Sequence, residues 1–172
     1  MLTDVMECHD QESELAQTLS GLVSAAVEGL VSDVVVLDRG SSDGSARVAD
    51  AAGCRFHSDW KLPDVLGTVR GEWLLFVEAG ARLQNGWIDE VLEYIALNQK
   101  PAQFSLAHHY RRPFLRRILN SAPPLEHGLL MPKGQALAAA RSGTSLVSLV
   151  GGLKPIRLRS ELVPARVARA AG

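Results

Sequence analysis

Apolar residues recur along the chain with two periods, and these periods predict its elements. Two apolar runs, Val34–Leu37 and Trp73–Val77, are typical of strands buried on both faces of a parallel sheet. Between Glu12 and Glu28 apolar residues return every three or four positions, which predicts an amphipathic helix ending at Gly29. The alternation of strands with helices indicates an α/β protein, with a mostly parallel sheet covered by helices on both faces.

The pattern is clear in the first half of the chain and weaker beyond Pro101. In the first half we expect strands over Thr3–Cys8, Asp33–Leu37, Cys54–His57 and Trp73–Val77, and helices over Glu12–Glu28, Ser45–Ala52 and from Asn85 onward. In the second half we expect strands over Gln103–Ala107, Gly128–Pro132 and Lys154–Leu158, a helix over Lys133–Arg141 and a helical turn over Ser145–Val150. Residues 161–172, rich in Ala and Arg, are expected to form a disordered tail.

A Gly- and Ser-rich loop follows the second predicted strand and begins with Asp38. Ligands of open α/β sheets bind beyond the carboxyl ends of the strands, so Asp38 is a candidate binding residue. The helix that starts at Gly44-Ser45 would direct backbone N–H groups toward an anion. The alternative is purely structural, with Ser42 or Asp43 capping that helix.

Charge is divided unevenly between the two halves of the chain. Residues 1–100 hold 17 acidic and 7 basic side chains, whereas residues 101–172 hold 2 acidic and 11 basic ones. The basic half either recruits an anionic partner or neutralises the acidic half within the fold. Aromatic residues are too few among the arginines to favour nucleic acid, so a nucleic-acid partner is not expected.

Cysteine usage and hydropathy indicate the compartment. Cys8 and Cys54 each lie in an apolar, strand-like context, which suits a reduced protein better than a disulfide framework. No apolar run reaches the roughly 18 residues of a membrane span, and no signal peptide is visible. We expect a cytoplasmic protein, with peripheral attachment to a membrane surface as the alternative.

Several segments together resemble the family-2 glycosyltransferases, which have the GT-A fold and use nucleotide-sugars. Val35–Ser45 is similar to the family's strand and Asp-Gly-Ser-rich loop, and Arg70–Leu83 to its strand that ends in Asp-x-Asp. Gly86–Glu90 is similar to the helix after that motif, and Gly128–Leu137 and Gly152–Arg157 are weaker matches on the acceptor side. The resemblance implies a single three-layer α/β/α domain.

The resemblance also implies a division of labour along the chain. Residues 1–98 would form a nucleotide-binding half and residues 99–160 an acceptor-side half. The implied activity is transfer of a sugar from a nucleotide-sugar to an acceptor of unknown identity, anionic or lipid-linked. The residues implied to bind the nucleotide are Cys8, His9, Asp10, Glu12, Asp38, Arg39 and Asp43. A helix cap remains the alternative for Asp43, and a solvated loop histidine for His9.

The metal-binding motif of the family is degenerate in this chain. Its Asp-x-Asp corresponds to Glu78-Ala79-Gly80, so Glu78 is the single carboxylate left to bind Mg²⁺ or Mn²⁺. We therefore expect a weakly bound divalent metal, and activity that is weak or metal-independent. Glu78 and Asp38 both follow buried strands, and we expect them to lie at one crevice. The alternative function is a catalytically inactive relative that serves as a nucleotide-binding or scaffolding module.

Candidate chemistry in the second half rests on fewer signals. The acidic pair expected on the acceptor side has no counterpart, so the catalytic residues stay unassigned. A basic stretch contains Arg111, Arg112, Arg116 and Arg117 and is the candidate surface for an anionic acceptor. Glu126-His127 is the one adjacent acid–imidazole pair of this half and a candidate for proton transfer.

Overall fold

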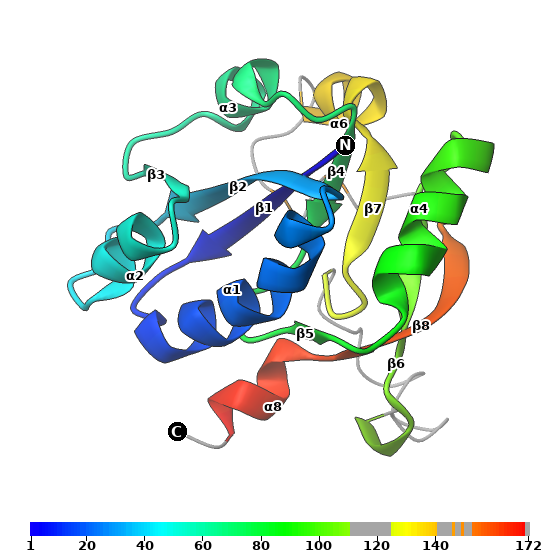
Figure 1. Ribbon diagram of the computed structural model, residues 1–172. Helices are drawn as coiled ribbons and strands as arrows, with labels where there is room; N and C mark the ends of the chain where they lie inside the picture. Colours follow the sequence, from blue (N-terminus) through cyan, green and yellow to red (C-terminus); the bar gives the residue numbers. More distant parts are fainter. Residues whose placement is uncertain (111–124, 141–145, 147–148, 150–152, 171–172) are drawn as a thin grey trace.

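The structure, a computed structural model, describes residues 1–110, 125–140, 146, 149 and 153–170. One mixed sheet of eight strands runs through this part of the chain (Figure 1). In spatial order the strands are β3 (Arg55–His57), β2 (Val31–Asp38), β1 (Leu2–Cys8), β4 (Trp73–Phe76), β7 (Leu129–Pro132), β6 (Ala102–Leu106), β8 (Ile156–Val163) and β5 (Arg82–Leu83).

Strand direction changes half-way across the sheet. The strands β3, β2, β1 and β4 pair in parallel, whereas β7 runs antiparallel to both β4 and β6. Beyond them β8 is parallel to β6 and antiparallel to β5. The sheet is therefore mixed: the predicted parallel pairing is present from β3 to β4 and between β6 and β8, whereas the other pairs are antiparallel. A run of buried apolar residues records burial but not direction, so the apolar pattern could not distinguish the two arrangements.

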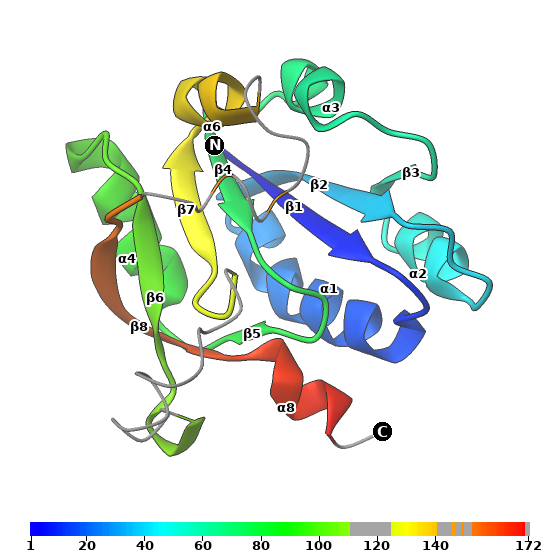
Figure 2. The same ribbon diagram turned by 180° about the vertical axis from the view of Figure 1, so that it is seen from behind.

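Helices lie on both sides of the sheet and build two hydrophobic cores. On one face lie α1 (Glu12–Val27), α2 (Ser45–Ala51) and α4 (Trp87–Leu97), which stand in front of the strands in Figure 1 and behind them in Figure 2. On the other face lie α3 (Leu62–Thr68) and α6 (Lys133–Ala140). Along β1 the side chains alternate, so that Met6 faces α1 and Val5 faces the core of α3.

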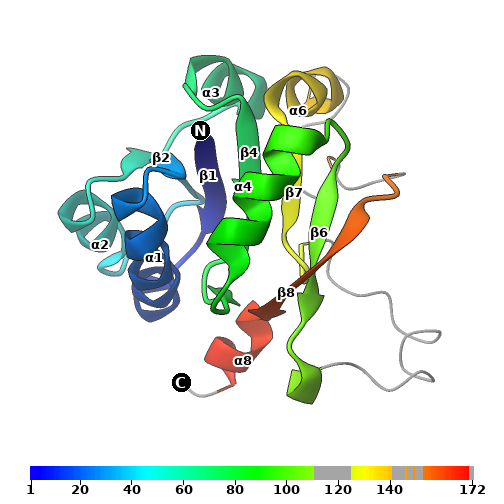
Figure 3. The ribbon, with the colours of Figure 1, turned by 45° about the vertical axis from the view of Figure 1, so that its right-hand side comes forward.

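The end of the chain differs from the prediction. In place of a strand ending at Leu158 and a disordered tail from residue 161, β8 continues to Val163 and α8 (Ala165–Arg169) follows. Leu162 and Val163 are buried because β8 pairs with β6 on one side and β5 on the other. Figure 3 shows α8 beneath the sheet, beyond the end of β8. Composition alone could not predict this order, because the partners of these residues lie far away in the sequence.

The short 3-10 helix η1 (His108–Tyr110) follows β6. The predicted turn over Ser145–Val150 lies almost wholly outside the described residues. None of the described helices is long and apolar enough to cross a bilayer.

A carboxylate is buried without a partner in the middle of β1. Asp4 is fully buried, and neither of its carboxylate oxygens has a hydrogen-bond partner in the described part of the chain. Burial raises the pKa of Asp4 well above the ordinary value. The folded state therefore binds this proton more tightly than the unfolded state, and the ionised form weakens the fold.

We predict that Asp4→Asn removes a pH-dependent loss of stability. An unfolded aspartate titrates near pH 4, so the wild-type free energy of unfolding should fall above about pH 4 by at most ~1.4 kcal/mol per pH unit. This fall should stop at the raised pKa of the folded state. Asparagine does not titrate. Over that pH window, urea denaturation should therefore show the free energy of unfolding of the variant rising relative to that of the wild type. The exposed Asp59→Asn is the control; equal pH dependence in both variants would contradict the prediction.

Candidate functional site

A cavity of about 210 Å³ lies where β1 and β4 end. The end of β1 contributes Glu7, Cys8 and His9, and the residues after β4 contribute Val77, Glu78 and Ala79. The chain passes from β1 to β2 on one side, while β4 pairs with β1 on the other, so this edge is the switch point of the sheet. Ligands of α/β proteins bind at such switch points.

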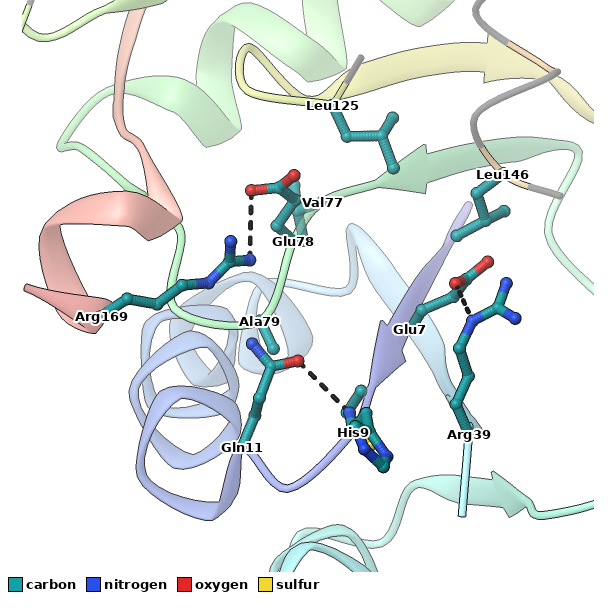
Figure 4. Close-up of a pocket in the computed structure, with 11 residues that line it drawn as sticks. Glu7, His9, Gln11, Arg39, Val77, Glu78, Ala79, Leu125, Leu146 and Arg169 are labelled. Carbon is teal, nitrogen blue, oxygen red and sulfur yellow. Dashed lines mark hydrogen bonds and ion pairs between the residues drawn. The ribbon is translucent and has the colours of Figure 1, made fainter. Parts of the chain in front are cut away.

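Two ion pairs face each other across the cavity (Figure 4). On one side, Arg39 Nε donates a hydrogen bond to Glu7 Oε2 at 2.6 Å. On the other side, Arg169 Nη2 lies 3.4 Å from Glu78 Oε2. The cavity therefore contains two guanidinium groups and two carboxylates.

The Arg39 guanidinium is held in position by its neighbours. Its central carbon lies 5.1 Å from the centre of the Trp60 ring, within range of a cation–π interaction. Trp60 is itself fixed, because its indole N–H donates to the Asp38 carbonyl at 2.8 Å. The hydrogen bond to Glu7 raises the pKa of Arg39, which keeps the side chain charged.

Glu7 also has a buried carboxylate oxygen without a partner. Its Oε1 atom has almost no accessible surface and no hydrogen-bond partner among the described residues. A buried acceptor without a partner costs about 1–3 kcal/mol, which a ligand N–H or hydroxyl donor would recover once the Glu7 carboxylate turned toward the cavity. Glu7 is therefore a candidate binding residue that the sequence analysis did not select.

The pKa of the Glu78 carboxyl is raised by its surroundings. Burial raises the pKa of Glu78, the charge of Arg169 lowers it in part, and the charge of Glu126 raises it again. Glu126 is itself 2% exposed and is paired with Arg166 Nε at 2.8 Å. Two acidic side chains thus approach each other at the end of β4, and each has an arginine from α8 as its partner.

Four of the eight candidate residues line this cavity: Cys8, His9, Arg39 and Glu78. The Cys8 thiol is buried and donates to Asp38 Oδ1 at 3.6 Å. Burial raises the pKa of Cys8 to about 12, with a further contribution from the charge of Asp38. Cys8 is therefore a packing residue and not a nucleophile at neutral pH.

Asp38 lies at the expected strand end, but its side chain is not among those that line the cavity. The carboxylate is buried and accepts hydrogen bonds from Gly40 N at 3.0 Å, Ser41 N at 3.1 Å and Ser41 Oγ at 2.5 Å. Burial alone would raise the pKa of Asp38, and these hydrogen bonds lower it below the ordinary value. Asp38 ends β2 and Glu78 follows β4, and these strands flank β1 and end at the same edge of the sheet, as expected. Of the two, only Glu78 lines the cavity, and a ligand contact for Asp38 stays a prediction.

Asp10, Glu12 and Asp43 join the loop after β1 to the loop after β2. Asp10 Oδ1 accepts from Ser42 N at 2.7 Å, and Asp43 Oδ2 accepts from Glu12 N at 2.9 Å. Glu12 Oε2 accepts from Gly44 N at 3.0 Å. These three side chains line a separate surface hollow. Their contacts are those of loop-stabilising residues, and a nucleotide contact for them stays a prediction.

Asp43 also accepts from Ser45 N at 2.9 Å, at the first residue of α2. The cap position of α2 is occupied by Gly44 and has no side-chain capping hydrogen bond, so the predicted cap by Ser42 or Asp43 is not formed. Asp43 lies one residue before the cap.

Solved structures of similar fold include glucosyl-3-phosphoglycerate synthase from Mycobacterium tuberculosis. With Mn²⁺, uridine diphosphate and glucosyl-3-phosphoglycerate bound, that enzyme is 15% identical, with 95% of this chain and 71% of that chain covered and a TM-score of 0.59. The structure of the same enzyme with Mn²⁺ and UDP-glucose bound is 16% identical, covers 78% of this chain and 57% of that chain, and has a TM-score of 0.58. A fragment of TarS from S. aureus is 12% identical, covering 86% of this chain and 52% of that chain, with a TM-score of 0.62.

The chain has a nucleotide-sugar transferase-like fold. In the last two of these comparisons it spans little more than half of the other chain. No protein-family model and no curated protein matches the sequence.

The residues after β4 do not fit a divalent metal ion. Glu78 is the only carboxylate in Glu78-Ala79-Gly80, and no group of three or more metal-ligating side chains occurs among the described residues. Gly80 has φ +97°, which disfavours a side chain. A Cβ atom on Gly80 would lie 3.1 Å from the Cβ of Ala168 in α8 and 3.3 Å from Glu14. The close packing of α8 thus disfavours a larger side chain at position 80.

The remaining candidates of the second half are partly described. Arg111, Arg112, Arg116 and Arg117 lie outside the described residues. Glu126 is paired with Arg166, and His127 Nδ1 lies 3.2 Å from the Phe104 carbonyl oxygen. Arg169 was missed because it stands in the predicted tail, 91 residues from its partner Glu78, and no local pattern indicates this pairing.

We predict that Gly80→Ala destabilises the fold more than Gly86→Ala does. Both glycines have a positive φ, of 97° and 86°, so both variants should lose about 1–2 kcal/mol. Only Gly80 is crowded, since nothing lies within 4 Å of a Cβ built on Gly86. Crowding should cost Gly80→Ala about 1 kcal/mol more in urea denaturation. Equal losses in the two variants would show that α8 does not pack closely on Gly80.

Proposed function

We propose that this protein binds a nucleotide-sugar in the cavity at the ends of β1 and β4 and transfers the sugar to an acceptor. The observation that carries this proposal is the cavity itself, which combines the switch-point position with two arginines and an unpartnered buried carboxylate oxygen. The similar fold of an enzyme that binds UDP-glucose supports the same ligand class.

The chemistry of the cavity suits the two ends of such a ligand. Glu7 Oε1 can accept a hydrogen bond from a base N–H or a ribose hydroxyl, while Arg39 beside it supplies positive charge. The cavity volume of about 210 Å³ is below the roughly 300–1,000 Å³ of typical ligand pockets, so it would enclose only part of a nucleotide-sugar. The sugar would then extend outward to meet the acceptor.

Transfer breaks the bond between the sugar and the diphosphate and forms a bond from the sugar to an acceptor hydroxyl. The nucleoside diphosphate leaves with additional negative charge, which positive groups in the site stabilise. Among the described residues that line the cavity, Arg39 and Arg169 carry permanent positive charge.

The charge of the second half of the chain is the basis for our proposal about the acceptor. One similar enzyme is known with glucosyl-3-phosphoglycerate, an anionic product. An anionic acceptor held by the basic second half is our proposal for this chain, with lipid-linked acceptors at a membrane surface as a variant. Three residues that line the cavity lie beyond residue 98, namely Leu125, Leu146 and Arg169. The proposed nucleotide site would therefore use more than the first half of the chain.

A binding or scaffolding module without transfer activity is the second candidate function. It is favoured by Gly80, which leaves the motif after β4 with one carboxylate. Release of uridine diphosphate from UDP-glucose in the presence of phosphoglycerate or other acceptors separates the two functions. Binding without any release would support the module.

We predict that UDP-glucose raises the melting temperature of the protein. At a ligand concentration of 100 Kd the stabilisation is about 2.7 kcal/mol, which for this size corresponds to roughly 5–10 °C. Arg39→Gln should weaken the affinity about tenfold, because a hydrogen bond to a charged group is lost.

The matched control is Arg157→Gln, which removes an exposed arginine on β8 outside the cavity. The site assignment would be contradicted if both variants lost affinity equally. The proposed function would be contradicted if no nucleotide or nucleotide-sugar changed the melting temperature.

A further inference from the structure

We infer that Arg169 takes the place of the divalent cation in this site, so that the chain binds the diphosphate of its ligand directly through arginine. This inference rests on the proposed function and specifies how the same cavity would hold phosphate groups. Three observations carry it: the packing of α8 on Gly80, the anchoring of α8, and the geometry of the Glu78–Arg169 pair.

The packing of α8 disfavours a side chain at position 80, and it also places the Arg169 guanidinium beside Glu78. The Cβ of Ala168 lies 3.1 Å from the position that a Cβ on Gly80 would take. The next residue, Arg169, extends to Glu78 on the same turn after β4. The motif of the resembling family brings two carboxylates to a cation, whereas this chain has one carboxylate and its own guanidinium at this turn.

An ion pair with one buried partner holds α8 in this position. Arg166 Nε donates to Glu126 Oε1 at 2.8 Å, and Arg166 Nη2 donates to the Tyr110 carbonyl. The Glu126 side chain is 2% exposed and that of Arg166 39% exposed, so solvent reaches the pair only from the arginine side. Arg166 and Arg169 are three residues apart and lie on neighbouring positions of one helix face. Anchoring Arg166 therefore also sets the position of Arg169.

The pair between Arg169 and Glu78 leaves the guanidinium able to take a second anion. Its 3.4 Å separation is longer than the 2.7–2.9 Å of a strong charge-assisted hydrogen bond. The Arg169 side chain is 48% exposed, and a guanidinium carries five N–H donors in a planar fork that matches two phosphate oxygens. Arg39 faces it across the cavity and offers a second fork.

An arginine site and a metal site predict opposite effects on affinity when the charge of Glu78 is removed. A metal ligand is needed for binding, so its removal weakens affinity and a chelator abolishes it. A carboxylate that merely pairs with Arg169 competes with the diphosphate, so its neutralisation should strengthen binding without any metal.

The test is isothermal titration calorimetry of the full chain with inorganic pyrophosphate and with uridine diphosphate. Each probe is titrated in EDTA, and uridine diphosphate is titrated again with Mn²⁺. We expect both probes to bind in EDTA, with Mn²⁺ changing the affinity for uridine diphosphate less than about twofold. Arg169→Gln should weaken both probes about tenfold or more, because hydrogen bonds to charged groups are lost.

Three further variants sharpen the result. Glu78→Gln should tighten binding several-fold in EDTA, Arg169→Lys should retain part of the affinity, and Arg157→Gln should leave it unchanged. Thermal unfolding of each variant shows whether α8 remains packed. The Glu78→Gln and EDTA experiments do not depend on the fold of an α8 variant, so they test the inference by themselves.

The outcomes separate this inference from the proposed function. Binding of uridine diphosphate only with Mn²⁺, lost in Glu78→Gln, would overturn the role of Arg169 and leave the nucleotide site standing. Pyrophosphate binding through Arg169, with no added affinity for uridine diphosphate or UDP-glucose, would support the arginine site and overturn the nucleotide-sugar function. Absence of binding by either probe in any condition would overturn both.

Discussion

The parallel pairing of β1 with β2 on one side and β4 on the other is the constraint on which the site depends. Parallel neighbours deliver their carboxyl ends to the same edge of a sheet, because each must return through a crossover before it pairs. Glu7, Arg39 and Glu78 therefore meet in one cavity, although they belong to three strand ends far apart in the sequence. Antiparallel pairing begins only beyond β4 and leaves this edge intact.

Acidic residues at this edge perform two different tasks. Asp10 and Asp43 accept backbone N–H groups across the two loops. Hydrogen bonds lower the pKa of both carboxyls, chiefly from the Ser42 backbone to Asp10 and from the Ser45 side chain to Asp43. Glu78 faces the cavity, and burial raises its pKa. Asp10 and Asp43 hold the loops in place, whereas Glu78 remains available to contact a ligand or a positively charged side chain. A cluster of acidic residues after a strand is thus ambiguous until the backbone donors are known.

Packing and charge are coupled at the turn after β4. Gly80 lets α8 approach, and α8 brings Arg166 and Arg169 to the two buried or half-buried acids Glu126 and Glu78. A Cβ at position 80 would lie 3.1 Å from the Cβ of Ala168, so α8 would have to shift by a few tenths of an ångström. The glycine at position 80 and the arginines near Glu78 and Glu126 thus belong to one helix contact.

The sequence by itself determined most strands and helices of the first half, though not the short strand β5, and the strand-end position of the site. Long apolar runs and helical periodicity depend on local burial, which residues near one another in the chain record directly. Tertiary structure decided the direction of the later strands, the order of the final helix and the burial of Asp38 beneath its loop. It also decided the two ion pairs of the cavity. Each of these depends on groups brought together from distant parts of the chain, as Arg169 is to Glu78, and a local pattern carries no record of such partners.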